Sequence, residues 1–356
     1  MKRKKIMNNF KHLYKKGVNL GGWISQYDKR KKIGDPHFDS FITEKDIAQI
    51  AGFKLDHVRL PVDYMVFERD DNPGVYDEAG LAYIDKCIGW CKKYKLNLLL
   101  DMHHVPGFSF FGGDSNSLFT DKDMQQRMIN IWVNFAKRYI DEGENLAFEL
   151  LNEIVEPDST RWNALAGKIV EAIREIDKER VILIGGNHYN AVSALKDIAI
   201  IPNDDNIVYN FHFYEPMLLT HQLASWNKMN MDYGLNTSYP GVFPKVAEFI
   251  EKYPQHSYLK RFIDHYVDVE HLKNDLKPAL EFIKNTGKTI YCGEYGVIEL
   301  ADSESRRNWH RDFNKLMDEY EIGRAVWSYK LMSFSFVDRD SNVVDSELWD
   351  IIAGQY

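Results

Sequence analysis

The feature that most constrains this chain is a repeated unit of apolar strand, turn and amphipathic helix. Several strands are continuous apolar runs, such as Leu98–Leu100 and Val181–Ile184, which is typical of a parallel sheet covered by helices on both faces. Between them lie helices such as Asp123–Asp141, whose apolar residues recur at helical spacing. The expected strands are Gly17–Ile24, Leu55–Val62, Asn97–His104, Asn145–Glu153, Arg180–Gly186, Asn206–Tyr214, Lys288–Gly296 and Arg324–Lys330.

Eight strands alternating with helices in 356 residues predict an α/β fold, a (β/α)8 TIM barrel. The alternative is an open doubly wound sheet, but the glycine-rich phosphate turn typical of that fold is absent from Gly17–Gly22. We expect one catalytic domain over residues 17–356, preceded by a solvated basic tail at 1–16. The connection 215–267, between the sixth strand and the sixth helix, is too long for an unstructured loop, so we expect an inserted subdomain over the active-site face.

Composition narrows the classes of function. The net charge of −8 argues against nucleic acid as the main partner, because phosphate binding needs concentrated Lys and Arg. No apolar run is long enough for a membrane span, and three cysteines cannot form a disulfide scaffold. No apolar stretch follows Lys2–Lys5, so no secretory signal is predicted and the location stays open: cytoplasmic as written, or exported if the sequence has been trimmed. Aromatic residues make up 13%, which suits a core or a cleft where sugar rings stack.

Polar side chains follow six of the eight expected strands. In a (β/α)8 barrel the active site is built at the carboxyl ends of the strands, so we expect these residues to meet in one place. Two of them, Glu153 and Glu294, follow strands four and seven and would face each other across the barrel mouth. The residues singled out around the pair are Arg59, His103, His104, Asn152, His212, Tyr214 and Trp327.

Two carboxyl groups beside a cleft are what hydrolysis of a glycosidic bond needs. One is protonated and donates to the leaving oxygen, and the other stabilises or attacks the anomeric carbon. A charged Arg59 nearby would lower the pKa of the attacking carboxylate. Either glutamate alone could instead be a helix cap or an ion-pair partner, and Glu149 is a rival carboxylate that we interpret as a buried structural group.

Metal and cofactor chemistry is not predicted. Neighbouring strand residues point to opposite faces, so His103 and His104 should not share an ion. No H-x-H or H-E-x-x-H motif occurs. Cys292 precedes Glu294 in the same strand phase, and we expect it to line the barrel interior. A G-x-S-x-G elbow, which would indicate serine hydrolysis, is also absent.

Several motifs together resemble glycoside hydrolase family five, the cellulase family of clan A, from about Gly17 to about Ile352. The stretch Phe148–Glu153, followed by Glu156–Trp162, is a particularly specific match. Many members have proline after the acid/base residue, where this chain has Ile154. The other matching motifs are Gly21–Trp23, His57–Pro61, Asp101–His104, Asn210–Tyr214, Gly293–Gly296 and Val326–Trp327.

The resemblance implies a retaining double displacement, with Glu153 as acid/base and Glu294 as nucleophile. It implies that Asn152 binds the sugar 2-hydroxyl, that Arg59 and Tyr214 hydrogen-bond Glu294, and that His103 and His212 support the pair. Trp327 would be the stacking floor of subsite −1, and His104 and Trp23 complete the expected substrate-binding set. Candidates for outer stacking are Trp23, Tyr27, Phe108, Phe110, Phe111 and Trp226.

The same resemblance implies internal β-1,4 bonds of soluble cellulose and mixed-linkage β-glucan as the target, with no cofactor and a monomeric enzyme. Mannanase, xylanase or broad β-glycanase activity on the same fold is the alternative. Two other classes stay open: a catalytically silent barrel that only binds polysaccharide, and a metal-dependent barrel hydrolase. A pure binder would need the aromatic residues but not the paired acids.

Overall fold

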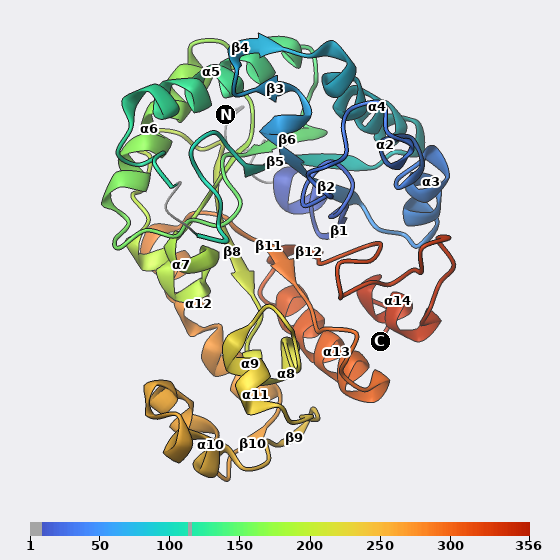
Figure 1. The fold of residues 1–356 in the computed structure, drawn as a ribbon, viewed down its shortest axis with the longest axis vertical. Coiled ribbons are helices and arrows are strands. Elements are labelled where there is room, and N and C mark those ends of the chain that lie inside the picture. The colour runs from blue at the N-terminus through green and yellow to red at the C-terminus, as the bar shows by residue number, and fades with distance from the viewer. Residues whose placement is uncertain (1–8, 113–115) are drawn as a thin grey trace.

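A computed structural model describes residues 9–112 and 116–356. Within them, eight parallel strands close into a barrel surrounded by helices (Figure 1), which confirms the predicted (β/α)8 fold. The order around the barrel is β1-β12-β11-β8-β7-β6-β5-β2. Their bounds are β1 Lys16–Asn19, β2 His57–Asp63, β5 Asn97–His104, β6 Leu146–Glu149, β7 Ile182–Gly185, β8 Ile207–Phe213, β11 Ile290–Tyr295 and β12 Gly323–Val326.

The outer layer consists of amphipathic helices whose apolar faces pack on the barrel. In α5, Met128, Ile131, Trp132 and Phe135 are all buried, as their helical spacing predicts. Side-chain caps such as Asp77 and Asp121 fix where these helices begin. The main outer helices are α3 Glu44–Gly52, α4 Glu78–Tyr94, α5 Lys122–Arg138, α6 Thr160–Arg174, α12 Lys277–Thr286, α13 Ser303–Glu319 and α14 Ser346–Ile352.

The remaining elements are short and decorate the loops. Helix α2 and the ribbon of β3 and β4 lie in the loops after β1 and β2, and α7 with η2 connects β7 to β8. Their bounds are α2 Pro36–Ser40, η1 Tyr64–Val66, β3 Glu68–Arg69, β4 Asn72–Tyr76, α7 Asn187–Asn190 and η2 Val192–Asp197.

The connection between β8 and α12 is folded, as its length predicts. Its most distant part, α10 with the two-stranded ribbon of β9 and β10, extends away from the barrel in Figure 1. The register of that ribbon pairs Tyr266 with Val242. The elements of this insertion are α8 Met217–Thr220, α9 Lys228–Tyr233, β9 Gly241–Val242, α10 Val246–Lys252, η3 Pro254–Phe262, β10 Tyr266–Val267 and α11 Val269–Asp275, the last running into α12.

The amino-terminal end of the barrel interior is closed by apolar packing. Phe10 and Tyr14 are buried there, with their rings stacked at 4.6 Å. The Tyr14 hydroxyl donates to the carbonyl of Glu144 at 3.0 Å. The prediction of a solvated tail is therefore wrong for this part of the segment, because these two rings fill the barrel floor; residues 1–8 lie outside the described residues. Their partners, from the strands or, for Val181, from the residue before β7, are Leu99, Ala147, Val181, Leu183, Val208, Tyr291 and Ala325.

Candidate active site

At the opposite, carboxyl end of the barrel, the buried guanidinium of Arg59 organises a group of carboxylates. It donates two hydrogen bonds of 2.7 Å to Glu149, one of 2.8 Å to Glu294 and one of 2.9 Å to the side chain of Asn152. Asp101 lies 3.1 Å from the same guanidinium. Glu149 is fully buried in this network, so its interpretation as a structural group is confirmed. Removing one partner from such a group would leave the others uncompensated.

Glu153 and Glu294 face each other across His212 of β8. The Nδ1 atom of His212 is 2.9 Å from Oε1 of Glu153 and 3.7 Å from Oε2 of Glu294. Tyr214 donates from its hydroxyl to Oε2 of Glu294 at 3.0 Å. One oxygen of each carboxylate and a ring nitrogen of His212 all lie within 4.8 Å of one another. The expected contacts of Arg59 and Tyr214 with Glu294 are therefore present.

The electrostatics of the pair separate the two glutamates. Burial raises the pKa of Glu153 well above its usual range, and the neighbouring carboxylate of Glu294 adds to the rise. Burial also raises the pKa of Glu294, to about 7, and the charge of Arg59 opposes that rise. Arg59 thus acts in the predicted direction, but burial outweighs it. Arg59 and Tyr214 both donate to Glu294 and so stabilise its ionised form. When the pair of glutamates holds one proton, that proton is therefore favoured on Glu153.

A β-bulge in β11 turns Glu294 into the barrel mouth. Cys292 is paired with Phe211, and Glu294 with His212, so Gly293 is an extra residue in β11. Without it, strict alternation would point Glu294 outward. For the same reason Cys292 does not line the barrel interior: it belongs to the apolar layer between the strands and the helices, together with Phe211. The prediction that Cys292 and Glu294 share one strand face is wrong.

A second irregularity, in the pairing of β2 with β5, brings His103 and His104 together. The register shifts so that Asp63 pairs with His104, and the two imidazole rings lie 5.6 Å apart. The expectation that they point to opposite faces is therefore wrong. Each is held by its own carboxylate, His103 by Asp101 at 2.8 Å and His104 by Asp63 at 2.5 Å. Their Nδ1 atoms are thus occupied by separate aspartates.

The two expected tryptophans have different environments. The ring of Trp327, just after β12, lies parallel to His103 at 5.7 Å, and a Cβ on Gly21 would come within 2.6 Å of it. Trp327 therefore packs against His103, at the edge of the cluster of carboxylates around Arg59. Trp23 is fully buried: it stacks on Trp90 at 6.0 Å and donates from Nε1 to the carbonyl of Phe38. The prediction that Trp23 contacts substrate is wrong, because its ring is a core side chain.

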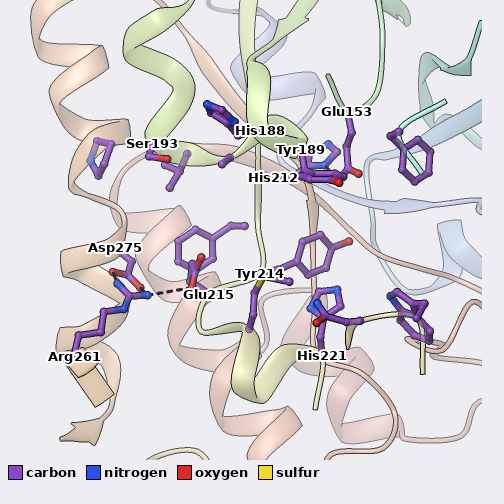
Figure 2. Close-up of a pocket in the computed structure, with 18 of the residues that line it drawn as sticks. Glu153, His188, Tyr189, Ser193, His212, Tyr214, Glu215, His221, Arg261 and Asp275 are labelled. Carbon is purple, nitrogen blue, oxygen red and sulfur yellow. Dashed lines mark hydrogen bonds and ion pairs between the residues drawn. The ribbon is translucent and has the colours of Figure 1, made fainter. Parts of the chain in front are cut away.

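A cleft of about 810 Å³ opens beside Glu153, His212 and Tyr214 (Figure 2). Trp226 of the insertion and Tyr189 of α7 line it and are more than half exposed. Tyr189 is not identified from the sequence; it follows the fifth expected strand, Arg180–Gly186. Other residues that line the cleft include Phe110, Phe111, Glu215, His221, Asn227, Arg261 and Asp275.

The predicted outer stacking residues divide into two groups. Phe110, Phe111 and Trp226 line the cleft, and Phe111 is 69% exposed. Phe108 is buried, and Tyr27 packs edge-on against Phe38 at 5.0 Å. Phe108 is therefore a core residue, and neither Phe108 nor Tyr27 is among the residues that line the cleft.

The acid pair also has the spacing of a possible cation site. Glu153, His212 and Glu294 are close enough to hold a cation, but the same spacing brings an acid and a nucleophile together. None of the helices within 9–112 and 116–356 is both long and apolar enough to cross a membrane. Asp101, which joins Arg59 to His103, is not among the site residues that the sequence predicts, although its spacing of two residues from His103 on one strand favours this contact.

A (β/α)8 barrel with two carboxyl groups at its mouth, one whose pKa is raised well above its usual range and one held by arginine and tyrosine, defines a glycoside hydrolase type of site. The chain belongs to the cellulase family, glycosyl hydrolase family 5, whose model matches residues 16–333. This confirms the family indicated by the sequence motifs.

The relatives agree with this assignment. Endoglucanase C of Acetivibrio thermocellus is 52% identical over 340 residues, which cover 96% of this chain and 98% of the relative. Cellodextrinase A of Ruminococcus flavefaciens is 36% identical, covering 87% of this chain and 83% of the relative. Among solved structures, Thermotoga maritima Cel5A in complex with cellobiose has a TM-score of 0.77 at 23% identity, covering 99% of each chain, and supports the fold.

Proposed function

We propose that the protein is a retaining endo-β-1,4-glucanase that hydrolyses internal bonds of soluble cellulose and mixed-linkage β-glucan. The observation that carries this proposal is the carboxylate pair. An oxygen of Glu153 lies within 4.8 Å of one of Glu294, which fits the roughly 5–5.5 Å spacing of retaining enzymes better than the roughly 6.5–9.5 Å of inverting ones. An inverting enzyme needs room for a water between the two groups.

In the first step, Glu294 attacks the anomeric carbon and Glu153 protonates the departing glycosidic oxygen. The bond from the anomeric carbon to that oxygen breaks as the ester to Glu294 forms. Arg59 and Tyr214 orient the attacking carboxylate, and Asn152, whose side-chain oxygen accepts from Arg59, binds the sugar 2-hydroxyl in this proposal. This step needs Glu153 protonated, which the raised pKa provides.

In the second step, Glu153 is ionised and takes a proton from water, which attacks the same carbon and releases Glu294. The anomeric configuration is retained because the carbon is inverted twice. His212, hydrogen-bonded to Glu153, has a pKa lowered by burial and by the charge of Arg59. It is therefore neutral and does not compete with Glu153 for the proton that is transferred.

Glucan as substrate is supported by the names of the relatives, among them Endoglucanase C and Cellodextrinase A. A Thermotoga maritima Cel5A structure has been solved with mannotriose, so mannan belongs in the substrate test. We further propose that the insertion forms one wall of the binding cleft, since Trp226, Asn227 and Arg261 all line it.

The proposal is tested by product profiling on carboxymethylcellulose, barley β-glucan, mannan and xylan, with proton NMR of the first anomer released. We expect short β-anomeric oligosaccharides from the two glucans and much slower release from mannan and xylan. First release of the α-anomer, or faster cleavage of mannan, would contradict the proposal. Activity that is lost on adding a chelator and restored by a divalent cation would favour the metal-dependent alternative.

A further inference from the structure

We propose that Asn210 is a positioning residue that holds the nucleophile Glu294 in its attacking orientation, an inference that rests on the proposed function. Asn210 lies on β8 inside the barrel and is fully buried. Both atoms of its side-chain amide already have protein partners, Gly293 and Glu149, so we place its action through these groups and not through contact with the sugar.

The first observation is the bulge that Asn210 stabilises. Glu294 faces the barrel mouth because Gly293 is the extra residue in β11, as described above. The backbone N–H of Gly293 donates to Oδ1 of Asn210 at 2.9 Å. A bulged residue is left out of the regular ladder of the sheet. The side chain of Asn210 thus supplies the acceptor that pins the bulge in place.

The second observation is the other end of the same amide. Nδ2 of Asn210 donates to Oε1 of Glu149 at 2.7 Å, and Glu149 binds Arg59 through both of its oxygens. Arg59 in turn donates to Glu294. A closed circuit of hydrogen bonds therefore runs from the backbone of Gly293 through Asn210, Glu149 and Arg59 to the carboxylate that the bulge carries.

This circuit fixes Glu294 from two directions. Asn210 sets the backbone direction at the bulge, and through Glu149 it sets the position of the guanidinium that binds the carboxylate. Both amide atoms are used, so the orientation of the amide is determined by its partners. A side chain that could only accept or only donate would satisfy one of the two bonds.

Steric fit gives a third, independent observation. A Cβ at position 293 would lie 2.7 Å from Nδ2 of Asn210 and 3.1 Å from Nε2 of His212. The residue that turns Glu294 inward must therefore be glycine while Asn210 and His212 keep their places. The backbone of Gly293 packs directly against both side chains, so a displacement of Asn210 is transmitted to Glu294.

The test separates nucleophile positioning from proton donation. The full chain and its N210A variant are reacted with 2-deoxy-2-fluorocellobiosyl fluoride, a substrate that forms the glycosyl ester without needing an acid, and steady-state rates are measured on cellotetraose. We expect N210A to lower both the labelling rate and kcat, each by about 10²-fold, as a misplacement of about 1 Å does. KM should stay within a small factor, because the cleft is unchanged.

Two comparison variants make the result specific. N314A removes a buried amide that bonds Arg324 and the carbonyl of Ile351, outside the circuit, and should lower thermal stability without slowing labelling. N210D keeps the acceptor for Gly293 but puts a second carboxyl against Glu149. Its activity should recover as pH falls and the two carboxyls share a proton.

Three outcomes decide the proposal. Labelling of N210A at the wild-type rate, with only a lower Tm, would overturn it and make Asn210 a structural residue. A loss in N314A equal to that in N210A would overturn it as well. If wild-type enzyme neither cleaves cellotetraose nor is labelled, the proposed function itself fails, which is distinguishable because that result involves no variant.

Discussion

The two ends of the barrel interior are built from the same strands but from opposite kinds of side chain. The amino-terminal end is filled by apolar and aromatic residues, with Phe10 and Tyr14 closing it. The carboxyl end holds the buried guanidinium of Arg59, which pairs with the carboxyl groups of Asp101, Glu149 and Glu294, and Glu153 lies beside this group. The apolar amino-terminal end is what a stable core requires, whereas burying the charged groups of the carboxyl end costs desolvation free energy.

Stability and activity depend on opposite ends of the barrel interior. Apolar packing stabilises in proportion to the surface it removes from water, whereas buried ion pairs often contribute little net stability because desolvation opposes them. We therefore interpret the buried charges at the carboxyl end by their effect on activity: they orient Glu294 and shift the pKa values of Glu153 and Glu294. Substitutions at the carboxyl end should therefore lower activity, and substitutions at the amino-terminal end should lower stability.

The largest expected effect is on activity at the charged end. Glu153→Gln should lower hydrolysis of barley β-glucan by about 10²–10⁴-fold, since it removes the proton donor. Glu294→Gln should lower it further, because no covalent ester can form. Both variants should still fold, as judged by circular dichroism and thermal melting. Wild-type hydrolysis rates in either variant would end the assignment of the pair.

The next effect is on stability at the apolar end. Phe10→Ala should cost about 3–5 kcal/mol of unfolding free energy, because it opens a cavity under the barrel floor. The specific activity of the folded fraction should stay at the wild-type level. Lys11→Ala, at a neighbouring position that is partly exposed, is the control and should change neither quantity. Lost activity in a fully folded Phe10→Ala protein would break the separation of the two ends.

A third prediction uses pH. Burial raises the pKa of Glu153 in the folded state above the pKa of about 4.3 that a glutamate has in the unfolded chain. As pH rises above about 4.3, the free energy of unfolding therefore falls, because the folded state resists the ionisation of Glu153. Glu153→Gln removes this penalty, and its Tm should exceed that of the wild type by more at pH 8 than at pH 5. Melting curves at both values measure the difference. An equal gain in Tm at both pH values would show that ionisation of Glu153 does not destabilise the folded protein.

The smallest effect is expected at the rim of the cleft. Trp226→Ala should raise KM for β-glucan by about twofold to tenfold, as expected for an aromatic contact of about 0.5–1.5 kcal/mol, and change kcat little. Tyr266→Ala is a matched control, since Tyr266 is exposed to a similar extent but does not line the cleft. Equal effects of the two substitutions would show that the cleft wall does not bind substrate.

Much of the fold could be predicted because strands and helices leave strong periodic signals. Apolar runs such as Val181–Ile184 predict the strands, and the polar residues that follow the strands predict the position of the active site at the barrel mouth. Alternation failed at the two register shifts, near Gly293 and near His103, because the alternation rule has no place for an extra residue. It therefore misplaced Cys292 and separated His103 from His104.

Exposure was the other property that the sequence could not supply. The residue type of Trp23 or Phe10 does not distinguish a buried ring from one that lines a cleft or lies in an exposed tail. Both rings are buried by partners that are distant in sequence. Tyr189 shows the reverse case. It is presented to the cleft on a left-handed backbone stretch after β7, and no periodic pattern marks such a residue.

The central claim is tested most directly by finding where the enzyme is labelled. After reaction with 2-deoxy-2-fluorocellobiosyl fluoride, which loses its anomeric fluoride, and proteolysis, mass spectrometry should find one added 2-deoxy-2-fluorocellobiosyl group on the side chain of Glu294. A label on Glu153 or Glu149, or continued hydrolysis with no labelled carboxylate, would contradict the account.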